Sequence, residues 1–527
     1  MNKLTFNDLP TAKLHIEKLE RDNEEMRAEI ARLFELIRLA NKARFGQSSE
    51  KARYILDEQT SLFNEAEAYV DESAPEPVII EKHTRKPKRT KEQLAKELPV
   101  QEIVIELPEN ERVCGICEGD LHSIGKTFVR RELNIIPAKA FVTEIYQTSY
   151  NCNDCVNETD EANIIKAPVP VPVIKRGLAS PSSAAYVFYQ KYVNAMPLYR
   201  QAKDWANFGV NICRATLANW IIYISLMWLS PLWEQMKVQL LTAEIILADE
   251  SVLQVLKEPG KTPQSESRMW VYRTGNGCGP PIILFEYQPT RAGEHPKKFL
   301  EGTKPGFFLH TDGYAGYNSV KDAVHCGCYA HLRRKFNDAL PKTEQKDSKA
   351  LEGLTFCQKL FKFEDSWVDL SPENRLEQRQ EHSKPVLDDF FAWLETVNPL
   401  KGSKLSEAVT YARNQRKPLS AFLLDGRIEI STNKVENAIR PFAVGRKNFL
   451  FAATVNGAKA SAIAYSIVET ARANDLNPYQ YLLHLFTVLP SVLTKNPQAD
   501  LSEFFPWTHS VREKCRFAVG ADGQLQI

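Results

Sequence analysis

Two aspartates stand at the ends of apolar runs, a pattern that places carboxylates at the edge of a sheet. One run in AEIILADES (243–251) ends at Asp249, and a second in PGFFLHTDGY (305–314) ends at Asp312. Two carboxylates brought within a few ångströms repel each other unless a cation lies between them. Their hard oxygen atoms suit Mg²⁺ or Mn²⁺, which also bridge to phosphate. Because an aspartate after a strand also commonly opens a turn, each residue alone is weak support for a metal site.

A third carboxylate, Glu436, lies at the start of a predicted helix in STNKVENAIRPFAVGRKNFLF (431–451). The run from Asn433 to Glu436 also resembles a capping box, in which the glutamate merely caps the helix. Arg440, Arg446 and Lys447 follow closely. Clustered cations beside a carboxylate site are expected where nucleic-acid phosphates pass, so the three are candidate DNA contacts.

CYAHLRRKF (328–336) lies between the second and the third carboxylate. Its His331, Arg333 and Arg334 are candidate phosphate contacts near the site. Cys326, Cys328 and His331 also suggest a second zinc site, but this C-x-C-x-x-H run has no obvious fourth ligand. Buried thiols in a strand are the simpler interpretation.

Four other cysteines have the spacing of a structural zinc site. Cys114 and Cys117 form one C-x-x-C pair, and Cys152 and Cys155 form a second. The segment between the pairs alternates as strands do, so we expect a closed four-thiolate site that holds one Zn²⁺. His122 is a competing ligand, and a redox pair is the weaker alternative.

Residues 196–224 predict two helices joined by a turn around Gly209. Helix, short glycine turn and helix is the geometry of a helix-turn-helix module, whose second helix enters the major groove of DNA. Arg214, Thr216 and Asn219 are the candidates to face the groove. Helix pairs with a glycine turn are common in α-rich proteins, so the motif alone is not specific.

The N-terminal segment predicts a coiled coil that makes at least a dimer through residues 9–40. The a/d repeat covers four heptads, and its polar Asn23 would fix the register. One position is filled by Ile16, Asn23, Ile30 and Ile37, and the other by Leu19, Met26, Leu33 and Ala40. A single amphipathic helix packed on its own domain is the alternative. The basic run KHTRKPKRTK (82–91) belongs to a charged linker that either lies along phosphates or contacts nothing.

The order of predicted elements favours a multidomain α/β protein with a ribonuclease-H-like domain. Three consecutive strands, a helix and a further strand are the opening of that fold, in which the first and fourth strands lie side by side. Asp249 and Asp312 would then meet. The expected organisation is a coiled coil (1–51), a linker (52–98), a zinc ribbon (99–165), a helix-turn-helix (175–235), the α/β domain (240–475) with a helical insertion (about 340–415) and a C-terminal element (476–527).

Bulk composition narrows the class of protein less than the motifs do. The 527 residues include 67 lysines and arginines against 66 acids, so net charge says nothing about partners. The apolar stretch WIIYISLMWLSPLW (220–233) is shorter than a membrane span of about 20 residues, and the N-terminus lacks the apolar core of a signal peptide. We therefore expect a cytoplasmic protein without a membrane partner.

Taken together, the motifs resemble the insertion sequence sixty-six family of DDE transposases. The resemblance rests on HTDGYAGY, CYAHLRRKF, STNKVENAIRPFAVGRKNFLF and the closing SIVETARANDLNPYQYL, and it covers nearly the whole chain. It implies that the catalytic triad is Asp249, Asp312 and Glu436, which would hold two Mg²⁺ or Mn²⁺ ions. It also implies small accessory proteins as partners. The first cysteine pair, CGIC, lacks the proline often seen there.

The predicted function is metal-dependent cleavage and transfer of DNA strands at the ends of an insertion sequence. A non-catalytic dimeric DNA-binding regulator, or a relic of a transposase, is the alternative from a different class. A nuclease that cuts without strand transfer would use the same ions, and the resemblance alone separates it from a transposase.

Overall fold

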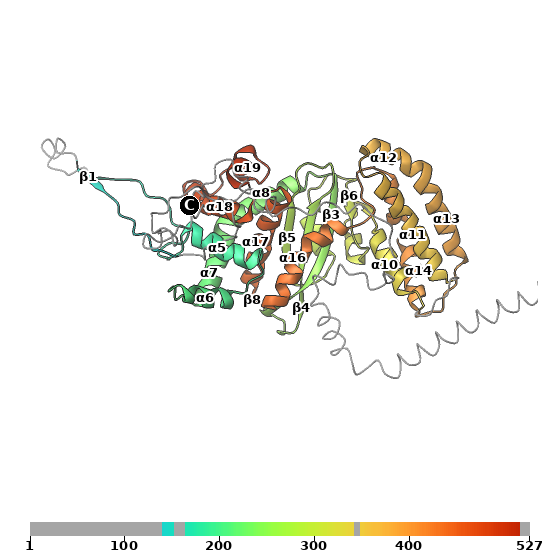
Figure 1. The fold of residues 1–527 in the computed structure, drawn as a ribbon, viewed down its shortest axis with the longest axis horizontal. Coiled ribbons are helices and arrows are strands. Elements are labelled where there is room, and N and C mark those ends of the chain that lie inside the picture. Colours follow the sequence, from blue (N-terminus) through green and yellow to red (C-terminus); the bar gives the residue numbers. More distant parts are fainter. Residues whose placement is uncertain (1–139, 152–163, 342–347, 517–527) are drawn as a thin grey trace, which may run out of the picture. The chain divides into compact units, whose positions relative to one another are not determined.

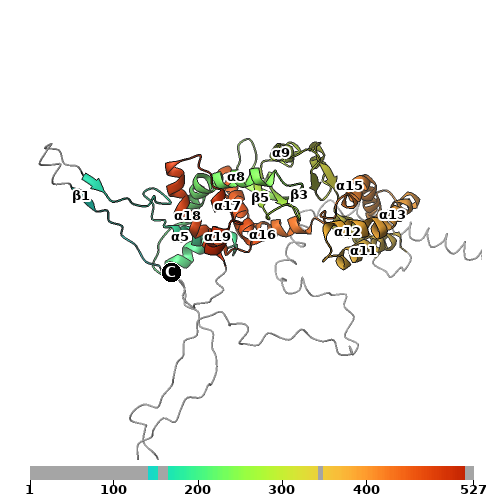
Figure 2. The same ribbon diagram turned by 90° about the horizontal axis from the view of Figure 1, so that it is seen from above.

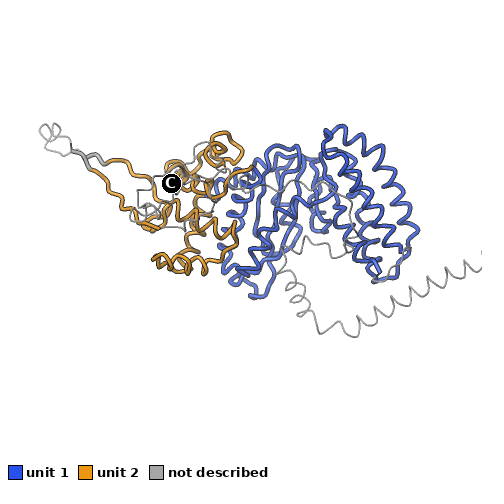
Figure 3. The backbone as a smooth tube through the Cα atoms, viewed as in Figure 1, with its two compact units in different colours: residues 1–79, 229–474 blue, residues 80–228, 475–527 orange. Residues whose placement is uncertain are grey.

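The computed structural model describes residues 140–151, 164–341 and 348–516. Its contacts divide the chain into two compact units, residues 1–79 with 229–474 and residues 80–228 with 475–527 (Figure 3). The predicted coiled coil, the linker and the four cysteines of the predicted zinc ribbon lie outside the described residues.

A six-stranded mixed sheet lies at the centre of the first unit (Figure 1). Three consecutive strands run antiparallel, and two more join in parallel on the free side of the first, which gives the order β5-β4-β3-β6-β7. The strands are β3 (Ile245–Lys257), β4 (Glu266–Thr274), β5 (Ile283–Gln288), β6 (Phe308–His310), β7 (Val324–Cys326) and β8 (Ala452–Thr454), which pairs with the far end of β3. The prediction that the first and fourth strands are neighbours is confirmed.

Strand β3 changes character along its length. The residues from Ile245 to Ala248 are all buried, as expected for a strand with neighbours on both sides, whereas the next four, starting at Asp249, are half-buried. The parallel neighbour β6 ends at His310, so β3 loses it where its polar residues begin. The predicted apolar run does end at Asp249, but the strand itself continues to Lys257.

Helix α17 (Val455–Ala473) covers the outer edge of the sheet at β5. The Ser466 hydroxyl accepts a hydrogen bond from the Phe285 N–H at 2.7 Å, and the Thr470 hydroxyl bonds both the N–H and the C=O of Ile283. An uncovered edge strand would offer these groups to another chain. The helix thus closes one side of the sheet, and the buried serine and threonine are explained by these bonds.

Further helices flank the strands, and some of them carry residues of the site described below. They are α8 (Ser230–Leu240), α9 (Glu294–Phe299), the 3₁₀ turn η4 (Ala315–Ser319), α10 (Tyr329–Asp338) and α16 (Asn433–Phe449). Helix α16 lies on the sheet, where its Phe442 contacts Phe285 of β5 with ring centroids 6.5 Å apart (Figure 1).

A group of helices between β7 and α16 forms one end of the first unit (Figure 2). Phe390 joins the group to Phe336 of α10, with ring centroids 6.2 Å apart, and contacts Phe356 within the group at 5.5 Å between centroids. The elements are α11 (Lys349–Ser366), α12 (Pro372–Gln378), the π-helical turn η5 (Arg379–Ser383), α13 (Lys384–Thr396), α14 (Lys404–Asn414), α15 (Arg416–Ser420) and η6 (Ala421–Leu423).

A fully buried arginine, Arg379, joins these helices to the segment that leads into α16. Its guanidinium donates to both carboxylate oxygens of Glu364, at 2.8 and 2.7 Å. It also donates to the backbone carbonyl oxygens of Phe422, Asp425 and Ile428, each within 2.9 Å. Five bonds from one planar fork fix the approach of the chain to α16, because each would leave a buried group unpaired if it were lost.

The second unit is mostly helical. Its α18 (Pro478–Lys495) packs on α5 (Pro181–Tyr192) through Phe486 and Phe188, whose ring centroids are 5.1 Å apart. The unit also contains α6 (Leu198–Asn207), α7 (Arg214–Ile224), η7 (Ser502–Phe504), α19 (His509–Cys515) and the paired strands β1 (Ser149–Asn151) and β2 (Ile164–Lys166). The C-terminal element therefore shares its core with the region of the predicted helix-turn-helix.

Helix α7 continues through a π-helical turn, η3 (Ser225–Leu229), into α8. The whole run Arg214–Leu240 is long and apolar enough to cross a membrane by length and composition, with 44% of its most apolar window buried. A core helix of a water-soluble protein passes the same test, so this run is weak support for a membrane span.

We predict that Arg379→Met lowers the free energy of unfolding by about 3–5 kcal/mol, because it leaves Glu364, whose side chain is only 11% exposed, without its partner. Lys404→Met is the matched control, since it breaks an exposed pair with Glu407 and should cost less than about 1 kcal/mol. Chemical denaturation of the full-length protein measures both. Equal losses in the two variants would contradict the role given to Arg379.

Candidate active site

The register of the parallel pair β3–β6 brings the two predicted aspartates to one place. Leu247 is paired with His310, and Asp249 and Asp312 each follow two residues later. The two carboxylates therefore stand near each other, just past the last paired position of β3 and β6. The sequence prediction located each of them at a strand end; in the structure, Asp249 lies inside β3 and marks the end of its parallel pairing.

The Asp249 carboxyl lies in an acidic and poorly solvated environment. Burial is the main cause that raises its pKa to about 7, and the charges of Glu250, Asp312 and Glu436 raise it further. The N–H of Glu250, which donates to Asp249 Oδ1 at 2.8 Å, opposes this shift. Such a group binds a proton or a cation in preference to standing ionised alone.

Asp312 also has the turn-forming role that the simpler interpretation gave it. Its Oδ1 accepts a hydrogen bond from the Tyr314 N–H at 2.8 Å, and its backbone oxygen accepts one from the Tyr411 hydroxyl at 2.8 Å. Gly313 has a φ of 89°, and a Cβ there would lie 3.0 Å from the Gln415 side chain. The turn therefore requires glycine, and its hydrogen bonds fix the orientation of the carboxylate.

A second carboxylate on β3, Glu250, is a residue that sequence reasoning missed. Its Oε1 accepts from Arg291 Nε at 2.7 Å, and its Oε2 accepts from the Tyr317 hydroxyl at 2.7 Å. Arg291 in turn lies over the Tyr314 ring, 3.8 Å from its centroid. The two tyrosines of HTDGYAGY therefore hold an arginine and a glutamate beside the aspartates, and the acid that follows Asp249 in sequence was the available signal.

Glu436 lies in the first turn of α16, but not as a capping residue. The N-cap is Thr432, and no side-chain hydrogen bond caps this helix end, so the capping-box interpretation does not hold. The Thr432 hydroxyl lies 3.1 Å from both Glu436 Oε1 and Cys328 Sγ. Since the charge of Glu436 acts on Asp249, the helix brings the third carboxylate toward the two aspartates.

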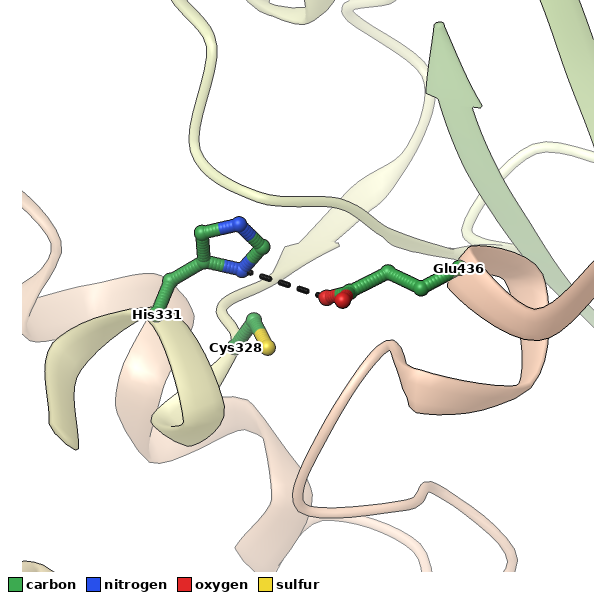
Figure 4. A group of neighbouring side chains, drawn as sticks. All are labelled: Cys328, His331 and Glu436. Carbon is green, nitrogen blue, oxygen red and sulfur yellow. Dashed lines mark ion pairs between the residues drawn. The ribbon is translucent and has the colours of Figure 1, made fainter. Parts of the chain in front are cut away.

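His331 and Cys328, at the start of α10, lie close to Glu436 (Figure 4). His331 Nδ1 is 3.6 Å from Glu436 Oε1. Its interaction with Cys328 raises the pKa of His331, against the effect of burial. Burial alone would raise the pKa of the Cys328 thiol, but bonds from His331 and Thr432 lower it below its ordinary value.

The basic residues predicted near the carboxylates are placed differently from one another. Arg334 lies 3.9 Å from Glu436 Oε2 with its side chain 62% exposed. Arg333 is exposed and lies over the Phe361 ring of α11, 5.7 Å from its centroid. Arg440 and Lys447 are exposed on α16, whereas Arg446 donates to the Val252 carbonyl oxygen of β3. Arg446 thus has a structural role that the sequence did not suggest.

The predicted helix-turn-helix residues belong to the second unit. Helices α6 and α7 are joined by a turn in which Gly209 has a φ of 87°. Arg214 and Asn219 of α7 are exposed, while Thr216 is half-buried, with its hydroxyl 3.3 Å from Cys213 Sγ. Trp205 and Trp220 hold the two helices together, with ring centroids 6.2 Å apart.

The residues just past the β3–β6 pairing fit a hard divalent cation. Asp249 and Asp312 offer carboxylate oxygens from neighbouring strands, which is the donor type that Mg²⁺ and Mn²⁺ prefer. Burial, and after it the charges of the neighbouring acids, raise the pKa of Asp249, as expected for a carboxyl group that no cation neutralises.

Comparison with protein families identifies related sequences along most of the chain. The family model described as "Transposase IS66 family" matches residues 176–460, more than half of the chain. Three shorter matches are the "zinc-finger binding domain of transposase IS66" at 111–156, the "IS66 C-terminal element" at 466–507 and "Transposase C of IS166 homeodomain" at 32–103.

Three similar proteins come from Sinorhizobium fredii, and each is named as uncharacterized. Protein y4jD is 30% identical over 79% of this chain and 81% of its own length. Protein y4qI is 29% identical over 95% of this chain and 93% of its own. Protein y4hP is 28% identical over 88% of this chain and 86% of its own length.

We predict that stability in buffer without divalent cations falls as pH rises from about 4 to about 7. In this range Asp249 stays protonated in the folded protein but is ionised in the unfolded chain, so the unfolded state binds fewer protons. Asp249→Asn should remove the contribution of Asp249 to this decrease in the free energy of unfolding, which is at most about 4 kcal/mol. Thermal unfolding across the pH range measures it.

Glu286→Gln is the matched control, because burial also raises the pKa of Glu286 on β5 to about 7. Mg²⁺ at pH 8 should stabilise the wild type and Glu286→Gln, and should stabilise Asp249→Asn much less. Equal stabilisation of all three proteins would show that the cation binds elsewhere.

Proposed function

Because the chain belongs to the IS66 transposase family, we propose that it cleaves and joins DNA strands at the ends of an insertion sequence. The observation that carries the proposal is the β3–β6 register, which sets Asp249 and Asp312 two residues beyond a paired position. Glu436 is the third member, since its charge acts on Asp249. The strand order β5-β4-β3-β6-β7 supports a ribonuclease-H-like catalytic domain.

Asp249, Asp312 and Glu436 would hold two Mg²⁺ or Mn²⁺ ions. Such ions would supply electrostatic stabilisation of the attacking and leaving oxygens of a phosphodiester. The Glu250 N–H and the Tyr314 N–H orient the two aspartates through their Oδ1 atoms, so the oxygens are fixed before DNA arrives.

Arg334, Arg333, Arg440 and Lys447 are exposed cations on the helices around the carboxylates and would bind DNA phosphates. Arg291, held by Glu250 and Tyr314, is a further cation beside Asp312, whose charge acts on it. No serine or tyrosine nucleophile is required, because water and a DNA 3′-hydroxyl are the attacking groups in this chemistry.

The remaining parts of the chain would bind and assemble. Arg214 and Asn219 would reach the major groove from α7, and Cys114, Cys117, Cys152 and Cys155 would hold one structural Zn²⁺. Residues 9–40 would join two protomers, and small accessory proteins of the same element would assist. A cytoplasmic location is expected for such an enzyme.

We predict that Asp249→Asn, Asp312→Asn and Glu436→Gln each reduce Mg²⁺-dependent DNA cleavage by about a hundredfold or more while DNA binding persists. The assay uses DNA that carries the native borders of the gene. Asp322→Asn, an exposed acid ten positions after Asp312, is the matched control and should cleave normally. Cleavage by a folded Asp312→Asn protein would contradict the assignment of Asp312 as a catalytic carboxylate.

We predict that Arg214→Ala weakens binding to the border DNA. The slope of log affinity against log salt concentration should decrease in magnitude by about one. Arg512→Ala is the control, since Arg512 is an exposed arginine on α19 of the same unit. Fluorescence anisotropy at several salt concentrations measures both. An unchanged salt slope in Arg214→Ala would exclude α7 as the DNA-reading helix.

A further inference from the structure

The C-x-x-H pair at the start of α10 has no part in the proposed reaction. Cys328 is the N-cap residue of the helix and His331 lies in its first turn. Residues three apart at a helix start share one side, so the thiol and the imidazole face the same space. The Cys328 side chain is fully buried, whereas the His331 side chain is 24% exposed.

Two contacts bring the start of α16 to the same space. The Tyr329 N–H donates to the Ile430 carbonyl oxygen at 3.0 Å, which joins the two chain segments. The Thr432 N–H then donates to Cys328 Sγ at 3.3 Å, and the Thr432 hydroxyl lies 3.1 Å from that sulfur. N–H and O–H donors of this kind stabilise a thiolate and are common around metal-bound sulfur.

Glu436 completes a group of three different donor atoms. Cys328 Sγ, a His331 ring nitrogen and a Glu436 carboxylate oxygen all lie within 4.8 Å of one another (Figure 4). Sulfur, nitrogen and oxygen donors together suit Zn²⁺ and discriminate against Mg²⁺, which prefers oxygen alone. The sequence suggested Cys326 as a ligand beside Cys328 and His331; the structure places Cys326 Sγ 3.7 Å from the Val324 carbonyl oxygen of its own strand and puts Glu436 in the group instead.

We propose that Cys328, His331 and Glu436 form a binding site for a thiolate-preferring divalent cation such as Zn²⁺, and that its occupation withdraws Glu436 from the Mg²⁺ site. The second half rests on the proposed function, because it takes Glu436 as a ligand of the catalytic cations. Binding would replace the proton of the Cys328 thiol, and a fourth position would stay open to water. The cation would therefore inhibit cleavage by competing with Mg²⁺ for one carboxylate.

The first test measures binding alone, with Zn²⁺ as the probe. Full-length wild type, Cys328→Ser, His331→Ala and Cys326→Ser are equilibrated with micromolar Zn²⁺ against a weak chelator, and bound zinc is measured by atomic absorption. We expect Cys328→Ser and His331→Ala to bind about one equivalent less than the wild type. Cys326→Ser, a buried cysteine two residues away, should match the wild type.

Cobalt provides a second readout on the same proteins. Co²⁺ bound through Cys328 should give a thiolate charge-transfer band, and the part of that band due to this site should be missing in Cys328→Ser. Circular dichroism verifies that each variant is folded. If Cys328→Ser fails to fold, the zinc content of His331→Ala is used to judge the site. This variant changes a side chain that is partly exposed. Equal zinc content in folded variants and wild type would overturn the site.

The second test measures Zn²⁺ inhibition of Mg²⁺-driven DNA cleavage, relative to each protein's own rate without zinc. His331→Ala should require about tenfold more Zn²⁺ for half-inhibition, and added Mg²⁺ should relieve the inhibition of the wild type. Zinc bound at the site without inhibition would contradict the withdrawal of Glu436. If no protein cleaves DNA, the proposed function fails, while the zinc content still decides whether the site exists.

Discussion

The pairing of β3 with β6 is the interaction on which the candidate active site depends. Three backbone positions, from Ile245 with Phe308 to Leu247 with His310, set two carboxylates near each other. A shift of this register by one residue would turn one aspartate to the other face of the sheet, because side chains alternate along a strand.

The carboxylates gathered here repel one another, and two of them are stabilised by fixed protein partners rather than by solvent. Glu250 has Arg291 and a tyrosine, and Glu436 has Thr432, His331 and Arg334 within reach. Asp249 has one backbone N–H and three acids around it, and burial together with these acids raises its pKa. In the proposed site a divalent cation would supply positive charge here, which would link the stability of this region to its chemistry.

Glu436 connects this region to the start of α10, and that connection gives the site two possible cations. A thiol and an imidazole lie within 4.8 Å of the Glu436 carboxylate, and the charge of that carboxylate also acts on Asp249. In the proposal, Glu436 binds one of these cations at a time, so the cation that it binds determines whether DNA is cleaved. The buried Arg379 matters here as well, because its five hydrogen bonds fix the segment that delivers Glu436.

The sequence located the strands before Asp249 and Asp312 because each is an apolar run followed by an acid, and it located Glu436 at a helix start. It did not predict contacts that join distant segments. Nothing near Glu250 in sequence indicates Arg291 or Tyr317, and nothing near Cys328 indicates Thr432. Likewise, Arg446 resembled a DNA contact in sequence, but its side chain is bonded to the backbone of β3. Exposure and long-range pairing, which decide these roles, are properties of the folded chain.

The most direct measurement is the anomalous scattering of Mn²⁺ in crystals of the full-length protein. The account predicts a peak within bonding distance, about 2.1–2.2 Å, of oxygens of both Asp249 and Asp312. The peak should be absent in crystals of Asp249→Asn. A Mn²⁺ peak that contacts neither aspartate, in crystals where both carboxylates are ordered, would contradict the claim that the β3–β6 register builds a cation site.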